Sequence, residues 1–492
     1  MRSPKTDNRI KTLEPWAATM CTIASLAQNN PGRRESLSLS TRTIAPPIGS
    51  NGLRRELGLG STTAAVIGGI IAVGIFLTPA GMAKALGSPF LLLLVWLVIG
   101  AMTMSGALCY GELAARFPRA GGAYVYLKES YGPRLAFLFG WMCLLVMDPA
   151  ITASLATGLA GYFGYIVPLP PVAIRLVGVT VICGLALMNI LSIRASAAFL
   201  RWTTWLKLGL LGFLTLWAVA FRLGSWSNFQ PFFAQREGSM PLAPALAVGV
   251  VGAFFSFGGW WDVGKIAGEV KDPGRTLPRA LLFGMLVVTF VYIMVSAVFL
   301  YLVPLNKVTS NETFVAQAGE VLFGLTGGVI FAAIVIICLI GSLSALIMAA
   351  PRVYYAMAED GLFLKAVART HPRFGTPANA IVIQAIIASF LVMIGTFEQI
   401  ISYAIFIVVF FLGLTISSLF IFRSRQEAEK SIILTLGYPV TPVVFLVLVA
   451  LMLVLVGGRS PRQALLGVLV VLAGLPVYEI FRRRLVPIRS MH

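Results

Sequence analysis

The chain has few charged residues, very little histidine and few cysteines. Charged residues make up 12% of its 492 residues, about half the share found in soluble proteins. Two histidines and five cysteines are present. Four of the cysteines lie in apolar stretches, and their spacing fits neither a disulfide framework nor a zinc site. We therefore expect no enzyme activity, no cofactor and no metal centre.

Acidic residues are scarcer than basic ones, which gives the chain a net charge of +19. A nucleic-acid-binding protein gathers such charge on one face of a soluble domain. Here the lysines and arginines lie in short loops between apolar runs, as in membrane proteins. We therefore expect no nucleic-acid partner, and a lipid bilayer around the chain instead.

Apolar residues are abundant, at 58% of the chain. They come in runs of about 20 residues, the length that crosses a bilayer as a helix. The sequence predicts an all-α polytopic membrane protein with about 12 transmembrane helices. The expected spans are 61–86, 89–114, 133–163, 172–192, 200–222, 243–268, 279–303, 325–357, 378–396, 399–422, 439–457 and 463–481.

Basic residues are concentrated in the loops that follow the even-numbered spans. The positive-inside rule then places both termini in the cytoplasm, and we expect a multi-pass protein of the plasma (inner) membrane. Residues 1–52 are polar and without periodicity, which favours a disordered cytoplasmic tail. Residues 53–425 form the expected transport core, and residues 426–492 hold helices 11 and 12 and a short cytoplasmic C-terminus.

Glycines interrupt two apolar spans that are five apart in order. Gly68, Gly69 and Gly74 lie in the first span, and Gly258 and Gly259 in the sixth. Unwound backbone at membrane depth is tolerated only inside protein or beside a cavity. Paired broken helices predict a 5+5 inverted repeat, with the substrate bound between helices 1 and 6. Close helix packing by small residues is the alternative use of these glycines.

The two breaks offer opposite partial charges to a ligand. Backbone N–H groups at the start of a half-helix suit a carboxylate, and unpaired carbonyl groups suit an ammonium group. This combination favours a zwitterion such as an α-amino acid. The expected substrate-binding residues are Ile71, Ala72, Val73, Gly74 and Ile75 at the first break and Phe255, Ser256, Phe257, Gly258, Gly259 and Trp260 at the second, with Phe255 as an aromatic gate.

Lys207 is an ionisable residue inside the fifth span. Such residues mark functional sites by default, although a lysine can also extend its amine to the membrane surface. We expect its ammonium group to replace a bound cation and to bridge the first break to the hydroxyls of Ser342 and Ser344. A buried lysine also changes protonation readily, so proton coupling is a second role for it.

Five further residues are candidates for the pocket or for gates. Asp148 is expected to face the same cavity. Asp262 is either a pocket acid or the partner of Lys265, and Trp261 lies beside it. Glu112 and Glu269 end the second and sixth spans near basic residues, where they predict ion pairs at the cytoplasmic rim, either as gates or as plain surface pairs.

Several stretches resemble the amino acid–polyamine–organocation superfamily, in particular its L-type amino acid transporters and their bacterial relatives. IIAVGIFLTP resembles the Gly-Ser-Gly-Ile-Phe motif of the first helix, and Lys207 falls where many members keep a lysine. The stretches are residues 70–79 (IIAVGIFLTP), 106–113 (GALCYGEL), 118–126 (PRAGGAYVY), 255–260 (FSFGGW) and 269–278 (EVKDPGRTLP). The resemblance covers roughly residues 52–425.

The resemblance implies a leucine-transporter-type fold and secondary active transport of amino acids by alternating access, as an exchanger or a proton-coupled permease. It implies that Lys207 replaces sodium. Two positions depart from the pattern: Val73 replaces a smaller residue, and Trp261 stands where L-type members often keep Asn. Residues 164–171 hold no cysteine, so we expect no disulfide-linked heavy chain.

Each of three alternatives to amino acid transport requires a further feature of the sequence. A polyamine or other organocation carrier needs several acidic groups in the membrane, and Asp148 and Asp262 are the candidates. A non-transporting membrane sensor needs a soluble signalling domain, which the polar tail is too short to supply. A membrane enzyme needs catalytic groups in the bundle, and histidine is nearly absent.

Overall fold

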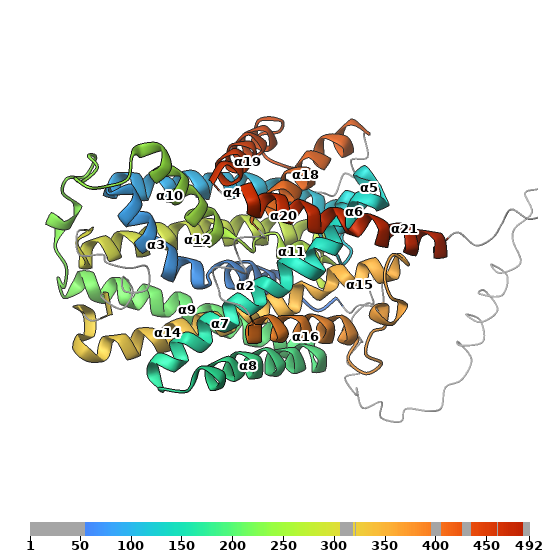
Figure 1. Cartoon of the computed structure of the whole chain (residues 1–492), viewed down its shortest axis with the longest axis horizontal. Helices are drawn as coiled ribbons and strands as arrows, with labels where there is room; N and C mark the ends of the chain where they lie inside the picture. The colour runs from blue at the N-terminus through green and yellow to red at the C-terminus, as the bar shows by residue number, and fades with distance from the viewer. Residues whose placement is uncertain are drawn as a thin grey trace, which may run out of the picture. The chain divides into compact units, whose positions relative to one another are not determined.

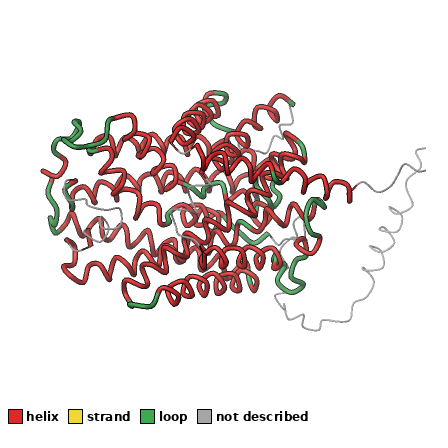
Figure 2. The backbone as a smooth tube through the Cα atoms, viewed as in Figure 1, coloured by secondary structure: helices red, strands yellow, loops and turns green. Residues whose placement is uncertain are grey.

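The structure is a computed structural model, and it describes residues 55–305, 318–319, 321–394, 405–425, 434–459 and 461–485. The expected N-terminal tail, residues 1–52, lies outside the described residues. Within these ranges the chain is helical and forms no strand (Figure 2). A single parallel bridge joins Leu57 to Val270.

The helices follow the expected spans closely in the first half of the chain. Span 1 is two helices, and span 3 is interrupted by a π-helical turn, labelled η1. The elements are α2 (Leu59–Ile70), α3 (Val73–Leu86), α4 (Pro89–Arg116), α5 (Ala123–Tyr131), α6 (Pro133–Met142), η1 (Cys143–Met147), α7 (Asp148–Ile166), α8 (Pro171–Leu191), α9 (Ile193–Ala220) and η2 (Trp226–Phe229).

The second half contains the other interrupted span. It continues with α10 (Leu242–Phe257), α11 (Asp262–Lys265), η3 (Ala267–Glu269), α12 (Pro273–Leu302), η5 (Gly324–Thr326), α14 (Gly327–Ala349), α15 (Pro351–Glu359) and η6 (Lys365–Ala368). The remaining helices are α16 (Ala378–Ile394), α18 (Ile405–Ser424), α19 (Val440–Arg459), α20 (Pro461–Leu472) and α21 (Gly474–Leu485).

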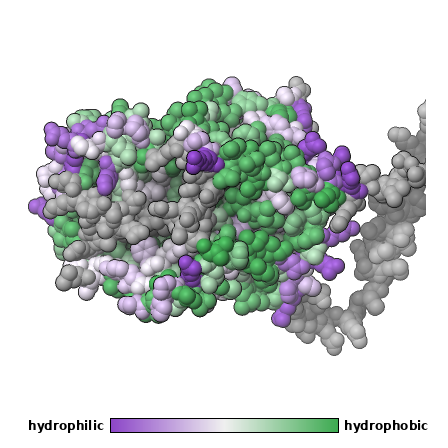
Figure 3. Space-filling view, viewed as in Figure 1, coloured by the Kyte–Doolittle hydropathy of each residue, from purple (hydrophilic) through white to green (hydrophobic). Residues whose placement is uncertain are grey.

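Nine stretches of helix in the described residues are long and apolar enough to cross a membrane. Three shorter apolar helices, Leu59–Ile70, Ala378–Ile394 and Val440–Leu455, coincide with the remaining expected spans. On the visible face, hydrophobic residues cover most of the area right of the centre, and hydrophilic residues gather mainly at the upper left and the right end (Figure 3). An all-α polytopic membrane protein is confirmed. The inverted repeat and the count of twelve stay predictions.

The breaks in the two interrupted spans lie where several helices pack together. α3 packs along α10, and α2 packs against α9, α12 and α14 (Figure 1). The close packing of α3 and α10 depends on glycine: a Cβ added to Gly74 would lie 2.6 Å from the Cα of Ser256. Both breaks are therefore buried between neighbouring helices rather than exposed to lipid.

Pro149 explains the π-helical turn before α7. Proline has no backbone N–H and its ring crowds the preceding turn, so the helix widens over Cys143–Met147 immediately before Asp148. π-helical turns of this kind are frequent at functional sites. Asp148 is thereby directed into the bundle, where its side chain is fully buried.

Candidate substrate site

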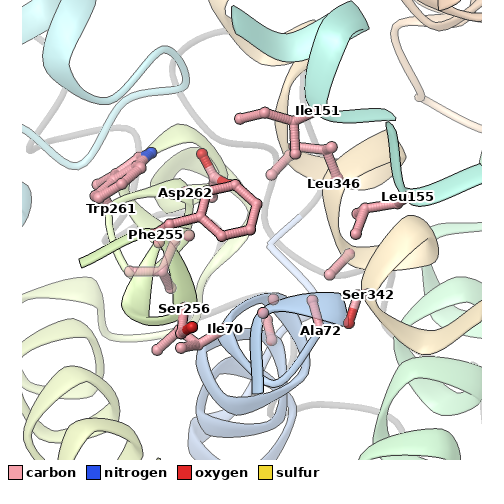
Figure 4. A pocket seen from close by; sticks show the side chains of 18 of the residues that line it. Ile70, Ala72, Ile151, Leu155, Phe255, Ser256, Trp261, Asp262, Ser342 and Leu346 are labelled. Carbon is pink, nitrogen blue, oxygen red and sulfur yellow. The ribbon is translucent and has the colours of Figure 1, made fainter. Parts of the chain in front are cut away.

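A cavity of about 110 Å³ lies where the two breaks meet. Gly69, Ile70, Ala72 and Gly74 line it from the first break, and residues of α7, α14 and α18 complete it. Figure 4 shows Phe255, Trp261 and Asp262 on one side, with Ile151, Leu155 and Leu346 opposite them. The wall is mostly apolar, and Asp262 is its one charged residue among the described residues.

The first break is a two-residue interruption. Ile71 and Ala72 leave helical geometry, with ψ of 87° and −154°. α3 then starts afresh, and no side chain caps its first turn. The first N–H groups of a helix have no intrahelical acceptor, and here Ala72 and Gly74 bring them to the cavity wall.

The carbonyl end of α2 is already occupied by protein donors. The fully buried Lys207 ammonium donates to the carbonyls of Gly68 (3.1 Å) and Ile71 (2.8 Å) and to the hydroxyl of Ser342 (3.2 Å). The Ser342 hydroxyl lies 2.8 Å from the same two carbonyl oxygens. Ser344 is buried but makes no hydrogen bond with Lys207, so the expected bridge runs through Ser342 alone.

One residue at the second break has a left-handed backbone conformation, which only glycine adopts readily. Gly259 has φ of +106°, and a Cβ there would lie 3.0 Å from the carbonyl oxygen of Gly69. The two breaks therefore touch through backbone. Of the carbonyls expected to be unpaired, that of Gly259 accepts from the Asp262 amide (3.1 Å), which corrects the sequence interpretation there.

Tyr292 of α12 joins the two breaks, and the sequence interpretation missed it. Its buried hydroxyl lies 2.9 Å from the carbonyl oxygen of Ile70 and 2.8 Å from that of Ser256. One hydroxyl carries a single proton, so it serves one of these carbonyls at a time. An aromatic residue in an apolar span gives no sign of this role in the sequence.

The predicted substrate-binding residues divide into two groups. Those that line the cavity are Ala72, Gly74, Phe255, Ser256, Gly258 and Gly259. Those that are absent from its wall are Ile71, Ile75, Phe257 and Trp260. Trp260 is fully buried and packs edge-on against Tyr110. It therefore packs against neighbouring helices on the side of the break that faces away from the cavity. The side chain of Val73 lies outside the described part of the structure.

Asp262 fulfils both roles that the sequence left open, and Asp148 does not reach the cavity. Lys265 bridges them, with its amine 2.8 Å from Asp262 Oδ1 and 2.7 Å from Asp148 Oδ1. The Tyr354 hydroxyl donates to Asp148 Oδ2 at 3.1 Å. Asp148 and Lys265 are 0% and 1% exposed and Asp262 is 16% exposed, so only Asp262 borders the cavity.

The expected rim ion pairs are buried and have other partners. Glu112 pairs with Arg116 as expected, but also with Arg423 (2.7 Å). Glu269 pairs with Arg352 of α15 at 2.8 Å, rather than with the basic residues that follow it in sequence. Both carboxylates are almost fully buried, so neither is a plain surface pair.

These features define an all-α membrane protein with a cavity between two broken helices, an arrangement that is typical of transporters. A sequence profile described as amino acid permease matches residues 57–474. The chain therefore belongs to the amino acid permease family, a family of membrane transporters.

Curated relatives match along most of their length. The serine/threonine exchanger SteT of Bacillus subtilis is 30% identical over 88% of this chain and 98% of its own. The b(0,+)-type amino acid transporter 1 of Homo sapiens is 29% identical over 87% and 88%. The Asc-type amino acid transporter 1 of Mus musculus is 28% identical over 87% and 81%.

Proposed function

We propose that the chain carries α-amino acids across a membrane by alternating access, without sodium. The observation that carries the proposal is the meeting of two helix breaks of opposite polarity at one cavity. The amide end of α3 suits the substrate carboxylate, and the carbonyl end of α10 suits its ammonium group. The names of the relatives, which include an exchanger of serine and threonine, support amino acids over polyamines.

The hydrogen bonds at the first break support the proposal that transport is independent of sodium. In broken-helix transporters, unwound carbonyls hold the coupling cation. Here the carbonyls of Gly68 and Ile71 already accept from the Lys207 ammonium. With the Lys207 ammonium group in this place, neither of these two carbonyls is vacant for sodium.

A mostly apolar wall favours substrates with small or apolar side chains. A polyamine has no carboxylate to meet the amide end of α3, and it needs acidic partners at several points. Asp262 is the one acid on the wall among the described residues, and Lys265 already neutralises part of its charge. The cavity is therefore better matched to one zwitterion than to an extended polycation.

We further propose that both termini are cytoplasmic and that no disulfide-linked heavy chain is needed. The loop charges support the orientation. The stretch 164–171, which joins the third and fourth spans, contains no cysteine for a link to a second chain. Chemical labelling of single cysteines placed at the termini of the chain, in intact cells and after lysis, tests the orientation.

Uptake into proteoliposomes tests the central proposal. Purified protein is reconstituted and given a labelled mixture of L-amino acids outside, with sodium or choline as the external cation and with or without unlabelled amino acids inside. We expect uptake that is equal in sodium and choline. Uptake of labelled putrescine or spermidine, but of no amino acid, would replace this proposal with the polyamine alternative.

A further inference from the structure

The amine of Lys265 holds two carboxylates together inside the membrane-spanning bundle, beside the cavity. Asp148 comes from α7, and Asp262 and Lys265 belong to α11. The two carboxylates share one ammonium group, so the fully ionised cluster carries a net charge of −1. An unbalanced charge inside a bundle is costly unless it is neutralised, and the cluster therefore favours taking up one positive charge.

The groups around the cluster do not supply that charge. Tyr354 donates a hydrogen bond to Asp148, and Tyr110, Tyr126 and Cys143 are neutral side chains packed nearby. The nearest strong cation on α15, Arg352, is paired with Glu269 of η3. The excess negative charge thus remains with Asp148 and Asp262.

The chemistry of the surroundings selects a proton rather than a larger cation. Among the residues that the structure describes, no three His, Cys, Asp or Glu side chains gather to hold a metal ion. The Lys265 amine already fills the space between the two carboxylates, at 2.7 and 2.8 Å. A proton needs no further ligands and no further volume, and Asp262 gives it a path from the cavity.

We propose that Asp148, Lys265 and Asp262 form a proton-binding site that couples proton movement to substrate transport. One proton passes from cavity water to a carboxylate oxygen and returns to water on the opposite side of the membrane, so no bond other than O–H is made or broken. The inference rests on the proposed function and selects proton coupling for it. It places the coupling at this cluster, and leaves Lys207 as the fixed cation at the first break.

The test uses the full chain in proteoliposomes with a labelled mixture of the twenty L-amino acids outside and a pH-sensitive dye inside. Valinomycin and equal potassium concentrations on both sides hold the membrane potential at zero. For one coupled proton, each unit of inward pH gradient is expected to raise amino acid accumulation about tenfold. Proton entry must accompany the addition of amino acid.

Two variants remove the excess charge. Asp262→Asn and Asp148→Asn each leave one neutral aspartate–lysine pair, which mimics the protonated cluster. We expect both to lose the response to the pH gradient. Asp148→Asn, whose side chain does not reach the cavity, should also retain exchange of internal for external amino acid at symmetrical pH. The pH response of each variant is expressed relative to its own exchange rate, and an equal fall of exchange and pH response in Asp148→Asn overturns the inference, because it indicates a structural role.

A matched control exists elsewhere in the chain. Asp360 also accepts from a lysine, Lys128, and a tyrosine, Tyr124, but it is far along the sequence from α7 and α11 and does not line the cavity. Asp360→Asn removes the same chemical group from a similar trio. We expect it to keep the tenfold response per pH unit.

The outcomes separate this inference from the proposed function. If the wild-type protein takes up no amino acid under any condition, the proposed function fails. If it takes up amino acids but neither responds to the pH gradient nor carries protons, only the proton site fails. The inference is also overturned if Asp262→Asn keeps the pH response, or if it removes only the uptake of lysine and arginine, which would make the cluster a substrate site.

Discussion

Replacing Lys207 by methionine tests the idea that a side-chain ammonium group holds the first break together. Methionine keeps much of the apolar volume of the lysine stem and removes its charge and donors. In the wild type, the ammonium group and the Ser342 hydroxyl together serve the carbonyls of Gly68 and Ile71. In Lys207→Met one hydroxyl proton remains for two carbonyls, so one of them is buried without a donor.

The magnitude follows from that count. A buried acceptor left without a donor costs about 1–3 kcal/mol. If the cost falls on the transport-competent arrangement of the break, its population drops by about 5- to 140-fold, because 1.4 kcal/mol is tenfold. The initial rate of amino acid uptake in proteoliposomes, normalised to the amount of folded protein, should fall by that factor.

Ser342→Ala is the matched comparison. Here the ammonium group keeps enough protons to donate to both carbonyls. Uptake should therefore fall by less than about 5-fold, the factor that corresponds to the smallest cost of a buried acceptor without a donor, about 1 kcal/mol. The double variant leaves both carbonyls without donors, and its loss should exceed the product of the two single losses. Wild-type uptake in Lys207→Met, or strictly multiplicative losses in the double variant, would refute the reasoning.

Three further variants test the surroundings of the site. Tyr292→Phe removes the hydroxyl shared by the two breaks, at a cost of about 0.5–1.5 kcal/mol, and should lower uptake by about 2- to 10-fold; an unchanged rate contradicts the bridging role. Arg352→Met leaves Glu269 buried without its partner, at a cost of about 3–5 kcal/mol; thermal unfolding in detergent should reveal a lower melting temperature, partly restored by adding Glu269→Gln. Gly74→Ala should abolish uptake because its Cβ meets backbone at 2.6 Å, whereas Gly161→Ala, with nothing within 4 Å, should not; equal uptake by both contradicts the close packing of α3 and α10.

Local sequence chemistry determined most of the fold and the location of the candidate site. Apolar runs of membrane length predicted the spans, because a helix in lipid satisfies its own backbone groups. Glycines in two such runs indicated approximately where the helices break. The first break, at Ile71 and Ala72, lies between Gly69 and Gly74, and Gly259 at the second break adopts φ of +106°. Lys207 is an ionisable residue in an apolar run. Placing such a side chain inside a membrane costs free energy, and this cost indicated that Lys207 has a functional role.

The partners of these residues were decided only by the tertiary structure. Lys207 meets the carbonyl of Ile71 across 136 residues, and Lys265 meets Asp148 across 117. The sequence indicated that Glu269 pairs with the basic residues that follow it. Its partner is Arg352, which lies on another helix and is distant in the sequence. Trp260 looked like a pocket residue and is packed behind it, since the direction of a side chain at a helix break depends on which helices surround it. The sequence determines at which positions of the apolar spans polar residues lie. The packing of the helices determines which of these residues contact one another.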